Sequence, residues 1–159
     1  MSDRGLAVLA FGHELPARLH GEKVDWRQSS DATANARRQL KEYFAGQRRE
    51  FTIPLDLRGT EFQRRCWDEL VRIPYGETRS YAEIARAVGS PNGFRAVGQA
   101  NHHNPVAIVV PCHRVLAGGR NLGGYGGGLP TKAFLLRLEG AVFHDDPVAE
   151  QPQAALKFT

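Results

Sequence analysis

The sequence of 159 residues has only two cysteines, no internal repeat and no hydrophobic run long enough to cross a bilayer. A spanning helix needs about 20 apolar residues, and the apolar stretch near the start, residues 6–11, is far shorter, so neither a membrane span nor a secretory signal is expected. The cysteines lie in unlike patterns, Cys66 inside a predicted helix and Cys112 after an apolar run. We therefore expect free thiols in a reducing compartment rather than a disulfide.

Charge of either sign is not strongly dominant. There are 21 Lys and Arg against 17 Asp and Glu, a formal net charge of +4, and 42% of the residues are hydrophobic. This composition is typical of a globular protein, and the modest basic excess favours a polyanionic partner without identifying one. The length allows one domain or two small ones.

The first 57 residues predict a small mixed α/β unit that serves as scaffold. Residues 6–11 and 51–57 are apolar enough for strands, although Pro54 restricts the second to an edge or an end. Between them Asp31 can cap a helix that ends near Gly46. The apolar face of this helix consists of Ala36, Leu40, Tyr43 and Phe44.

Two capping boxes mark helices in the next part of the chain. Thr60 to Gln63 begins a helix that Pro74 ends, and Ser80 to Glu83 begins a second that Gly89 ends. The first helix carries an apolar stripe that includes Cys66, which we interpret as a core thiol. The stripe is completed by Phe62, Trp67, Leu70 and Ile73.

A tight turn at residues 90–93 leads from the second of these helices into a third, over residues 94–101, with Phe94 and Val97 predicted to face inward. A helix, a tight turn and a helix of this size are typical of the helix-turn-helix motif. The third helix is therefore a candidate for DNA binding, although many helix pairs bind nothing.

A short apolar run, Val106 to Val110, lies between two prolines and predicts a buried strand. Pro111 ends it, so that Cys112 and His113 follow where the strand gives way to a loop. A thiol beside an imidazole is a potential nucleophile with a potential base. The dipeptide alone is a weak signal, because most cysteines are small buried hydrophobes.

The remaining chain predicts a glycine-rich loop, a helix and a tail. The loop, residues 117–129, brings backbone N–H groups close to a ligand but lacks the spacing of a phosphate-binding loop. Thr131 can cap a helix with Phe134, Leu135 and Leu138 on one face, and residues 145–159 are expected to be a flexible tail. Neighbouring His102 and His103 diverge in direction, so no metal and no cofactor are expected.

Five motifs, in order, resemble those of the O6-alkylguanine-DNA alkyltransferases, also called methylated-DNA–protein-cysteine methyltransferases. The resemblance covers residues 51–140. The motifs are Tyr75-Gly-Glu-Thr-Arg-Ser-Tyr81, Arg95-Ala-Val-Gly-Gln-Ala100, Asn104-Pro, Pro111-Cys-His-Arg-Val115 and Gly124-Tyr-Gly-Gly-Gly128.

The resemblance implies a catalytic role for five residues. Cys112 is expected to accept the alkyl group from guanine O6, in one irreversible turnover, after His113 has withdrawn the thiol proton through a bound water. Glu139 is expected to orient the imidazole, and Asn104 to hold the network together. Tyr81 is expected to donate a proton to the departing guanine.

The resemblance also implies a pocket and a DNA-binding helix. Val115, Tyr125 and Gly126 are expected to line the pocket. Arg95 is expected to fill the place of a nucleotide that has been turned out of the duplex. The small side chains of the same helix allow close approach to the minor groove; the expected DNA-binding residues are Arg95, Ala96, Gly98 and Gln99.

The implied fold is α+β: a ribonuclease H-like mixed domain over residues 1–57, apparently shortened, then a mostly helical, winged helix-turn-helix-like domain over residues 58–144. Residues 1–30 show one clear strand and lack the Pro-Leu-Gly-like turn that usually introduces a hairpin there. The expected partner is double-stranded DNA containing O6-alkylguanine, with O4-alkylthymine as a second candidate substrate. We expect a monomer in the cytoplasm, associated with the bacterial nucleoid.

Two other functions stay open at this point. Relatives with tryptophan at the cysteine position bind alkylated DNA without repairing it, but the residue here is Cys112, which favours transfer. A cysteine hydrolase would use the same thiol and imidazole with repeated turnover.

Overall fold

A computed structural model describes residues 1–12 and 29–144. The linking residues 13–28 and the tail that the sequence predicts to be flexible, residues 145–159, lie outside the described residues. No helix in the described part is long and apolar enough to cross a membrane. The regular elements are α1 (Ser30–Phe44), α2 (Glu61–Val71), β1 (Arg79–Ser80), α3 (Tyr81–Ala87), α4 (Phe94–His102), η2 (Cys112–Arg114), β2 (Val115–Leu116), η3 (Gly118–Arg120) and α5 (Leu129–Leu138).

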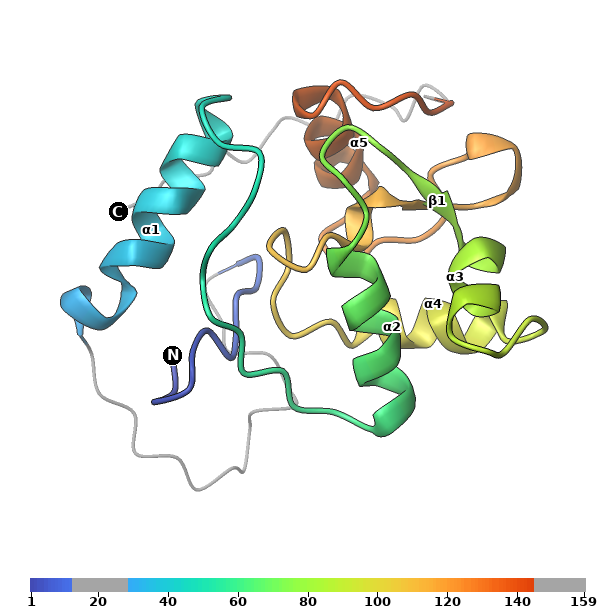
Figure 1. The fold of residues 1–159 in the computed structure, drawn as a ribbon. Coiled ribbons are helices and arrows are strands. Elements are labelled where there is room, and N and C mark those ends of the chain that lie inside the picture. The colour runs from blue at the N-terminus through green and yellow to red at the C-terminus, as the bar shows by residue number, and fades with distance from the viewer. Residues whose placement is uncertain (13–28, 145–159) are drawn as a thin grey trace.

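Helices α1 to α4 fall into two groups (Figure 1). Helix α1 lies on one side of the molecule, and α2, α3 and α4 pack together on the other, with the extended segment 45–57 passing between the two groups. Strands β1 and β2 form a parallel pair in which Arg79 lies opposite Val115. The described part is therefore a mixed fold, with helices as its main elements and this small sheet beside α3.

Both predicted capping boxes are confirmed. The Thr60 side chain accepts a hydrogen bond from the Gln63 backbone N–H, and the Gln63 side-chain oxygen accepts one from the Thr60 backbone N–H. Ser80 and Glu83 form the same reciprocal pair. These bonds satisfy backbone donors that the first turn of a helix leaves without partners. The two boxes therefore fix where α2 and α3 begin.

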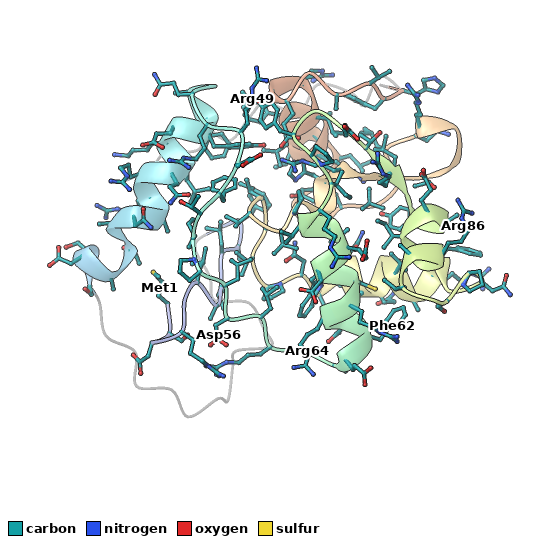
Figure 2. All side chains as sticks on the ribbon, in the orientation of Figure 1. Met1, Arg49, Asp56, Phe62, Arg64 and Arg86 are labelled. Carbon is teal, nitrogen blue, oxygen red and sulfur yellow. The ribbon has the colours of Figure 1, made fainter. Side chains whose placement is uncertain are left out.

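The predicted apolar stripe of α2 is also confirmed. Its buried members are Cys66, Trp67 and Leu70, while Phe62 is half-buried. The Trp67 indole Nε1 donates to the backbone oxygen of Ala100 on α4 at 2.9 Å. Charged side chains such as Arg64 on α2 and Arg86 on α3 point outward (Figure 2). The stripe thus joins α2 to α4 while the polar faces remain in solvent.

The helix-turn-helix geometry is present, but one inward-facing residue was predicted wrongly. Residues 90–93 form the turn, Val97 is completely buried, and Phe94 is 49% exposed. Phe94 is the first residue of α4, where the helix has not yet reached the core. A large apolar side chain therefore stands in solvent beside Arg95.

Helix starts at α1 and α5 differ from the predictions. The N-cap of α1 is Ser29, not Asp31, because the Ser29 side chain accepts from the backbone N–H of Ala32. Helix α5 begins at Leu129, before Thr131, with Pro130 in its first turn. Proline suits that position because its missing N–H would have no partner there.

The apolar face of α1 is as predicted, whereas that of α5 is so only in part. On α1, Leu40 and Tyr43 are buried. On α5, Leu135 is buried, but Phe134 is 36% exposed; its ring stacks on that of Phe44 at 6.4 Å. The α5 face toward the core therefore carries other residues than the sequence pattern suggested.

The predicted strands are mostly single bridges. Leu6 pairs with Leu55 and Leu9 with Val106, each as an isolated parallel bridge. The prediction of a buried strand from Val106 to Val110 was wrong: the run is buried, but it turns back on itself at Ile108, whose φ is +71°. The Val110 N–H donates to the Val106 oxygen across this turn at 3.0 Å.

We predict that Trp67→Phe lowers the free energy of unfolding by about 1–3 kcal/mol, since it removes buried ring volume and leaves the Ala100 oxygen without its donor. Urea denaturation followed by circular dichroism measures the change. Val71→Ala is the control, because Val71 is 48% exposed on the same helix and should change stability by less than about 0.5 kcal/mol. Equal midpoints for Trp67→Phe and the parent would contradict the prediction.

Candidate active site

Cys112 lies at the end of a loop that the Asn104 side chain fixes by hydrogen bonds. The Asn104 side-chain nitrogen donates to the Val110 oxygen at 2.8 Å and to the Cys112 sulfur at 3.0 Å, while its oxygen accepts from the Val106 backbone N–H at 3.0 Å. Cys112 then begins the 3-10 turn η2. The expected role of Asn104 as the residue that fixes this turn therefore has a direct geometric basis.

The Cys112 thiol is 7% exposed. Burial raises its pKa, and the hydrogen bond from Asn104 and the positive charge of Lys132 act in the opposite direction. The other cysteine, Cys66, is fully buried in α2, and burial raises the pKa of its thiol to about 11. The Arg65 charge is the one group that favours a Cys66 thiolate, whereas the Cys112 sulfur has both a hydrogen-bond donor, Asn104, and a cation, Lys132, that favour a thiolate.

His113 and Glu139 form a buried pair. The imidazole Nε2 donates to the Glu139 Oε1 at 2.9 Å, and both side chains are completely inaccessible to solvent. Burial lowers the pKa of His113, against the opposing effect of Glu139, so the imidazole is neutral at neutral pH. Among the described residues none bonds to Nδ1, which leaves that lone pair free to accept a proton.

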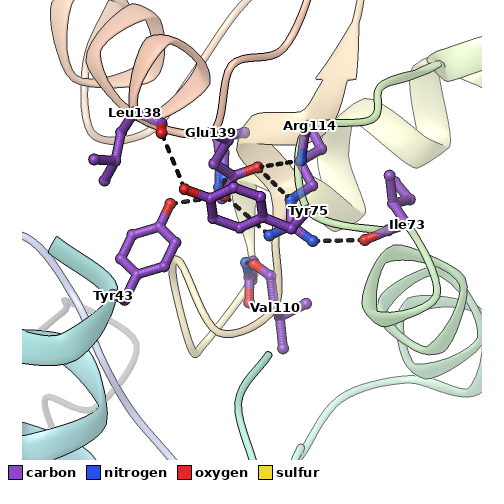
Figure 3. Close-up of polar contacts among 10 residues, drawn as sticks. Tyr43, Ile73, Tyr75, Val110, Arg114, Leu138 and Glu139 are labelled. Atoms are coloured by element: carbon purple, nitrogen blue, oxygen red, sulfur yellow. Dashed lines mark hydrogen bonds and ion pairs between the residues drawn. The ribbon is translucent and has the colours of Figure 1, made fainter. Parts of the chain in front are cut away.

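The Glu139 carboxylate is the centre of a larger cluster (Figure 3). Arg114 donates through Nε to Oε2 at 2.7 Å and through Nη2 to Oε1 at 2.9 Å, and its Nη1 donates to the Ile73 oxygen. Tyr43 donates to Oε1 at 2.7 Å. Burial alone would raise the pKa of Glu139, but the hydrogen bonds from His113 and Arg114 lower it to about 2. The carboxylate is therefore ionised at any physiological pH.

Arg114 and Lys132 are two buried cations that the sequence analysis did not single out. The Lys132 side chain is completely buried, and its Nζ donates to the backbone oxygens of Val115 at 2.6 Å, Gly124 at 3.3 Å and Leu122. Burial lowers its pKa to about 8. The ammonium group therefore ties β2 to the glycine-rich loop.

Two of the predicted site residues, Tyr81 and Tyr125, lie beside this ammonium group. Lys132 Nζ lies 5.9 Å from the centre of the Tyr81 ring and 6.0 Å from that of Tyr125. The Tyr81 hydroxyl donates to the Gly124 oxygen at 3.4 Å, and burial raises the pKa of both phenols. Gly126 is exposed on the same loop. Tyr81, Tyr125 and Lys132 are thus brought together, although they come from α3, the glycine-rich loop and α5.

Val115 belongs to the same buried cluster as Cys112, against which Tyr81 and Tyr125 also pack. Its side chain is completely buried in the core, and its backbone oxygen is the Lys132 acceptor. Through Lys132, the Val115 backbone is therefore linked to the glycine-rich loop.

Helix α4 presents the predicted DNA-binding residues on one face. Arg95, Ala96 and Gln99 are exposed, whereas Val97 faces the core. These residues make no contact with the thiol or the carboxylate cluster that the described structure records. Gly98 lies beside the Tyr81 ring, because a Cβ added there would lie 3.9 Å from it.

Comparison with known proteins gives matches over most of the chain. The family described as "6-O-methylguanine DNA methyltransferase, ribonuclease-like domain" matches residues 1–57, and "6-O-methylguanine DNA methyltransferase, DNA binding domain" matches residues 61–141. A methylated-DNA–protein-cysteine methyltransferase of Mycolicibacterium paratuberculosis is 59% identical over 117 residues, 74% of this chain and 71% of the relative. A constitutive one of Bacillus subtilis is 52% identical over 125 residues, 73% and 76% of the two chains.

Solved structures similar to this chain are also methyltransferases of this kind. The crystal structure of Mycobacterium tuberculosis OGT in complex with DNA has a TM-score of 0.72 and 53% identity, over 76% of this chain and 74% of that one. An O6-methylguanine DNA methyltransferase from Methanococcus jannaschii has a TM-score of 0.57 and 31% identity, over 87% and 84% of the chains.

The ionised Glu139 predicts a loss of stability in acid. Its pKa falls from about 4.5 in the unfolded chain to about 2 in the folded one, so the folded state is favoured above pH 4.5 and this advantage disappears as the pH falls from 4.5 toward 2. We expect Glu139→Gln to flatten the pH dependence in that window. It should also destabilise the fold at pH 7, because Arg114 loses its anion.

Thermal unfolding at half-unit pH steps measures both effects. Glu77→Gln is the control, because the Glu77 carboxylate is 52% exposed and pairs with Arg79 at the surface. An unchanged slope between pH 4.5 and pH 2 in Glu139→Gln would contradict the prediction.

Proposed function

The chain belongs to the 6-O-methylguanine DNA methyltransferase family, and on that premise we propose that Cys112 accepts the alkyl group when the protein repairs DNA by direct transfer to its own cysteine. The observation that carries the assignment is the arrangement around the thiol: Asn104 bonds the sulfur, and the next residue, His113, is paired with a buried carboxylate. The same protein holds no second thiol in such surroundings, because Cys66 lies in the apolar core.

The residues around Cys112 divide the reaction into proton transfer and displacement. The thiol proton passes through a bound water to the free lone pair on His113 Nδ1, and the Glu139 carboxylate stabilises the imidazolium that forms. The thiolate then attacks the alkyl carbon, a C–S bond forms, and the bond from that carbon to guanine O6 breaks. The sulfur ends as a thioether, so each molecule reacts once.

The leaving guanine takes the electron pair of the broken bond and needs a proton. The Tyr81 hydroxyl, at the start of α3, is the proposed donor to a ring nitrogen, and Tyr125 and Gly126 line the pocket. The Lys132 ammonium near both phenol rings favours negative charge at this place. An anionic leaving group is therefore stabilised while it is reprotonated.

A base in a stacked duplex is out of reach of a buried thiol, so the nucleotide must be turned out. We assign Arg95 to the vacated space and the exposed face of α4, with Ala96, Gly98 and Gln99, to the minor groove. The exposed ring of Phe94 beside Arg95 fits this use, because proteins that bind the minor groove often insert apolar side chains between base steps.

We also propose a domain organisation for the chain, an oligomeric state and a place of action. We place a scaffold domain at residues 1–57 and the alkyltransferase domain at residues 58–144, and we propose that the protein acts on duplex DNA as a monomer inside the cell. O6-alkylguanine is the primary substrate, and O4-alkylthymine is the second candidate. The domain boundary is supported by the two family matches, one of which ends at residue 57 and the other of which begins at residue 61.

Intact-protein mass spectrometry after incubation with duplex DNA containing O6-methylguanine tests the assignment. We expect one added methyl group, located on Cys112 by peptide mapping, and none in Cys112→Ser. Cys66→Ser is the matched control and should be methylated like the parent. Tight binding with no modification would indicate a damage sensor, and many repaired products per molecule would indicate a hydrolase; either result would refute the transfer proposal.

The role assigned to Arg95 predicts a difference between substrates. Arg95→Ala should slow repair of duplex DNA at least tenfold, because the extruded state loses the side chain that fills the gap, and should leave the reaction with free O6-benzylguanine within about twofold. Single-turnover kinetics with both substrates measure the two effects. Arg86→Ala, an exposed arginine on α3, is the control. Equal slowing of both reactions in Arg95→Ala would argue against base extrusion by this residue.

A further inference from the structure

The Tyr43 hydroxyl of helix α1 lies in the proposed active site. Tyr43 is completely buried, and its hydroxyl donates to the Glu139 Oε1 at 2.7 Å, across 96 positions of sequence. Figure 3 shows its side chain reaching from α1 toward the carboxylate. A residue of the region expected to be scaffold therefore contacts the carboxylate that orients His113.

Tyr43 donates to the same Glu139 oxygen that the His113 imidazole contacts. Glu139 Oε1 also accepts from His113 Nε2 and from Arg114 Nη2, each at 2.9 Å. The other oxygen, Oε2, accepts from Arg114 Nε and, at 3.4 Å, from the Gly76 backbone N–H. Three donors thus share the lone pairs of Oε1, so the bond from Tyr43 competes directly with the bond from His113.

We propose that Tyr43 is a positioning residue for alkyl transfer: its hydroxyl sets how strongly the Glu139 carboxylate holds the His113 imidazole, and through it how readily the Cys112 proton is taken. This proposal rests on the function proposed above. It makes the amino-terminal domain part of the proton relay in addition to its structural role.

A purely structural role for Tyr43 is the alternative. Its ring packs against those of Phe44 at 5.2 Å, Phe51 at 5.4 Å and Tyr75 at 6.1 Å. The ring and the hydroxyl have separable effects, because Tyr43→Phe keeps the packing and removes only the donor. The structural role therefore predicts a change in stability alone.

The groups around Glu139 define the sign of the effect. Around Glu139 stand the Arg114 guanidinium and the His113 imidazole from η2, the Tyr75 phenol that follows α2, and the Lys132 ammonium of α5, which acts on His113. Removing a donor makes the carboxylate more basic, so it stabilises the imidazolium more strongly and raises the pKa of His113. The neutral imidazole that accepts a proton then persists over a narrower range of pH.

The expected result is a shift of the acid limb of the rate profile. The rate of Cys112 alkylation by O6-benzylguanine, measured from pH 5 to pH 9, should fall off at higher pH in Tyr43→Phe than in the parent. The ratio of mutant to parent rates should therefore drop several-fold across the acid limb and return to within about twofold at alkaline pH.

Tyr75→Phe is the matched control. It removes a phenol hydroxyl from the same cluster, but that hydroxyl donates to the backbone oxygen of Leu138 at 3.0 Å and not to the carboxylate. It should lower the melting temperature without moving the acid limb. An unmoved limb in Tyr43→Phe, or an equal shift in Tyr75→Phe, would overturn the proposal.

A second variant covers the case in which Tyr43→Phe does not fold. Replacing Tyr43 by 3-fluorotyrosine keeps the hydroxyl and makes it a stronger donor, so the acid limb should move to lower pH, opposite to the phenylalanine variant. A shift to higher pH, or no shift, would contradict the proposed role.

Iodoacetamide separates this proposal from the function on which it rests. It alkylates a thiolate without any guanine, and Cys66→Ser restricts the reaction to Cys112. If the parent fails to react with alkylguanine but the iodoacetamide profile still responds to Tyr43→Phe, the relay stands and the repair function fails. If repair occurs and neither profile responds, the function stands and the role of Tyr43 fails.

Discussion

The neutralisation of one buried carboxylate organises the structure. Moving an ionised carboxylate out of water costs several kcal/mol unless charged and hydrogen-bonding partners replace the solvent. Glu139 obtains such partners from α1 through Tyr43, from η2 through His113 and Arg114, and from the turn after α2 through the Gly76 backbone. These segments are far apart in sequence, so the requirement to satisfy Glu139 fixes their relative positions.

The groups that satisfy the buried Glu139 carboxylate serve the reaction as well as the fold. A carboxylate that is held ionised by fixed donors can orient an imidazole and stabilise its charged form without reorganisation during the reaction. Arg114 contributes to both, because it supplies two donors to Glu139 while its remaining bond to the Ile73 oxygen anchors it to the end of α2. Loss of Arg114 would leave an unpaired buried anion, which is a defect of stability and of catalysis at once.

Local signals predicted the parts of the fold that depend on local physics. Thr60 and Ser80 mark helix starts because the bonds that cap a helix lie within four residues. The strand predicted from Val106 to Val110 failed because β-branched residues are equally suited to a buried turn, and the bonds of Asn104 that hold this turn come from outside the run. Phe94 was placed inward because helical periodicity does not show that the first residue of α4 lies outside the core.

The site was predicted in part, for a related reason. Cys112 and His113 lie in one of the motifs and Glu139 was named through the resemblance, and the structure brings His113 and Glu139 into contact. Lys132 carried no such signal, because a lysine among apolar residues of a helix resembles a surface residue until three backbone oxygens are found around it.

Tyr43 was recognised only as one apolar position of α1, since periodicity reports the ring and not the hydroxyl. The side chains that tune a reactive group often reach it from distant segments, and hydrogen bonds formed across the fold have no period in the sequence. A sequence pattern can therefore identify the groups that react more readily than the groups that set their proton affinities. In this protein the second kind of information lies in which atoms share the two oxygens of Glu139.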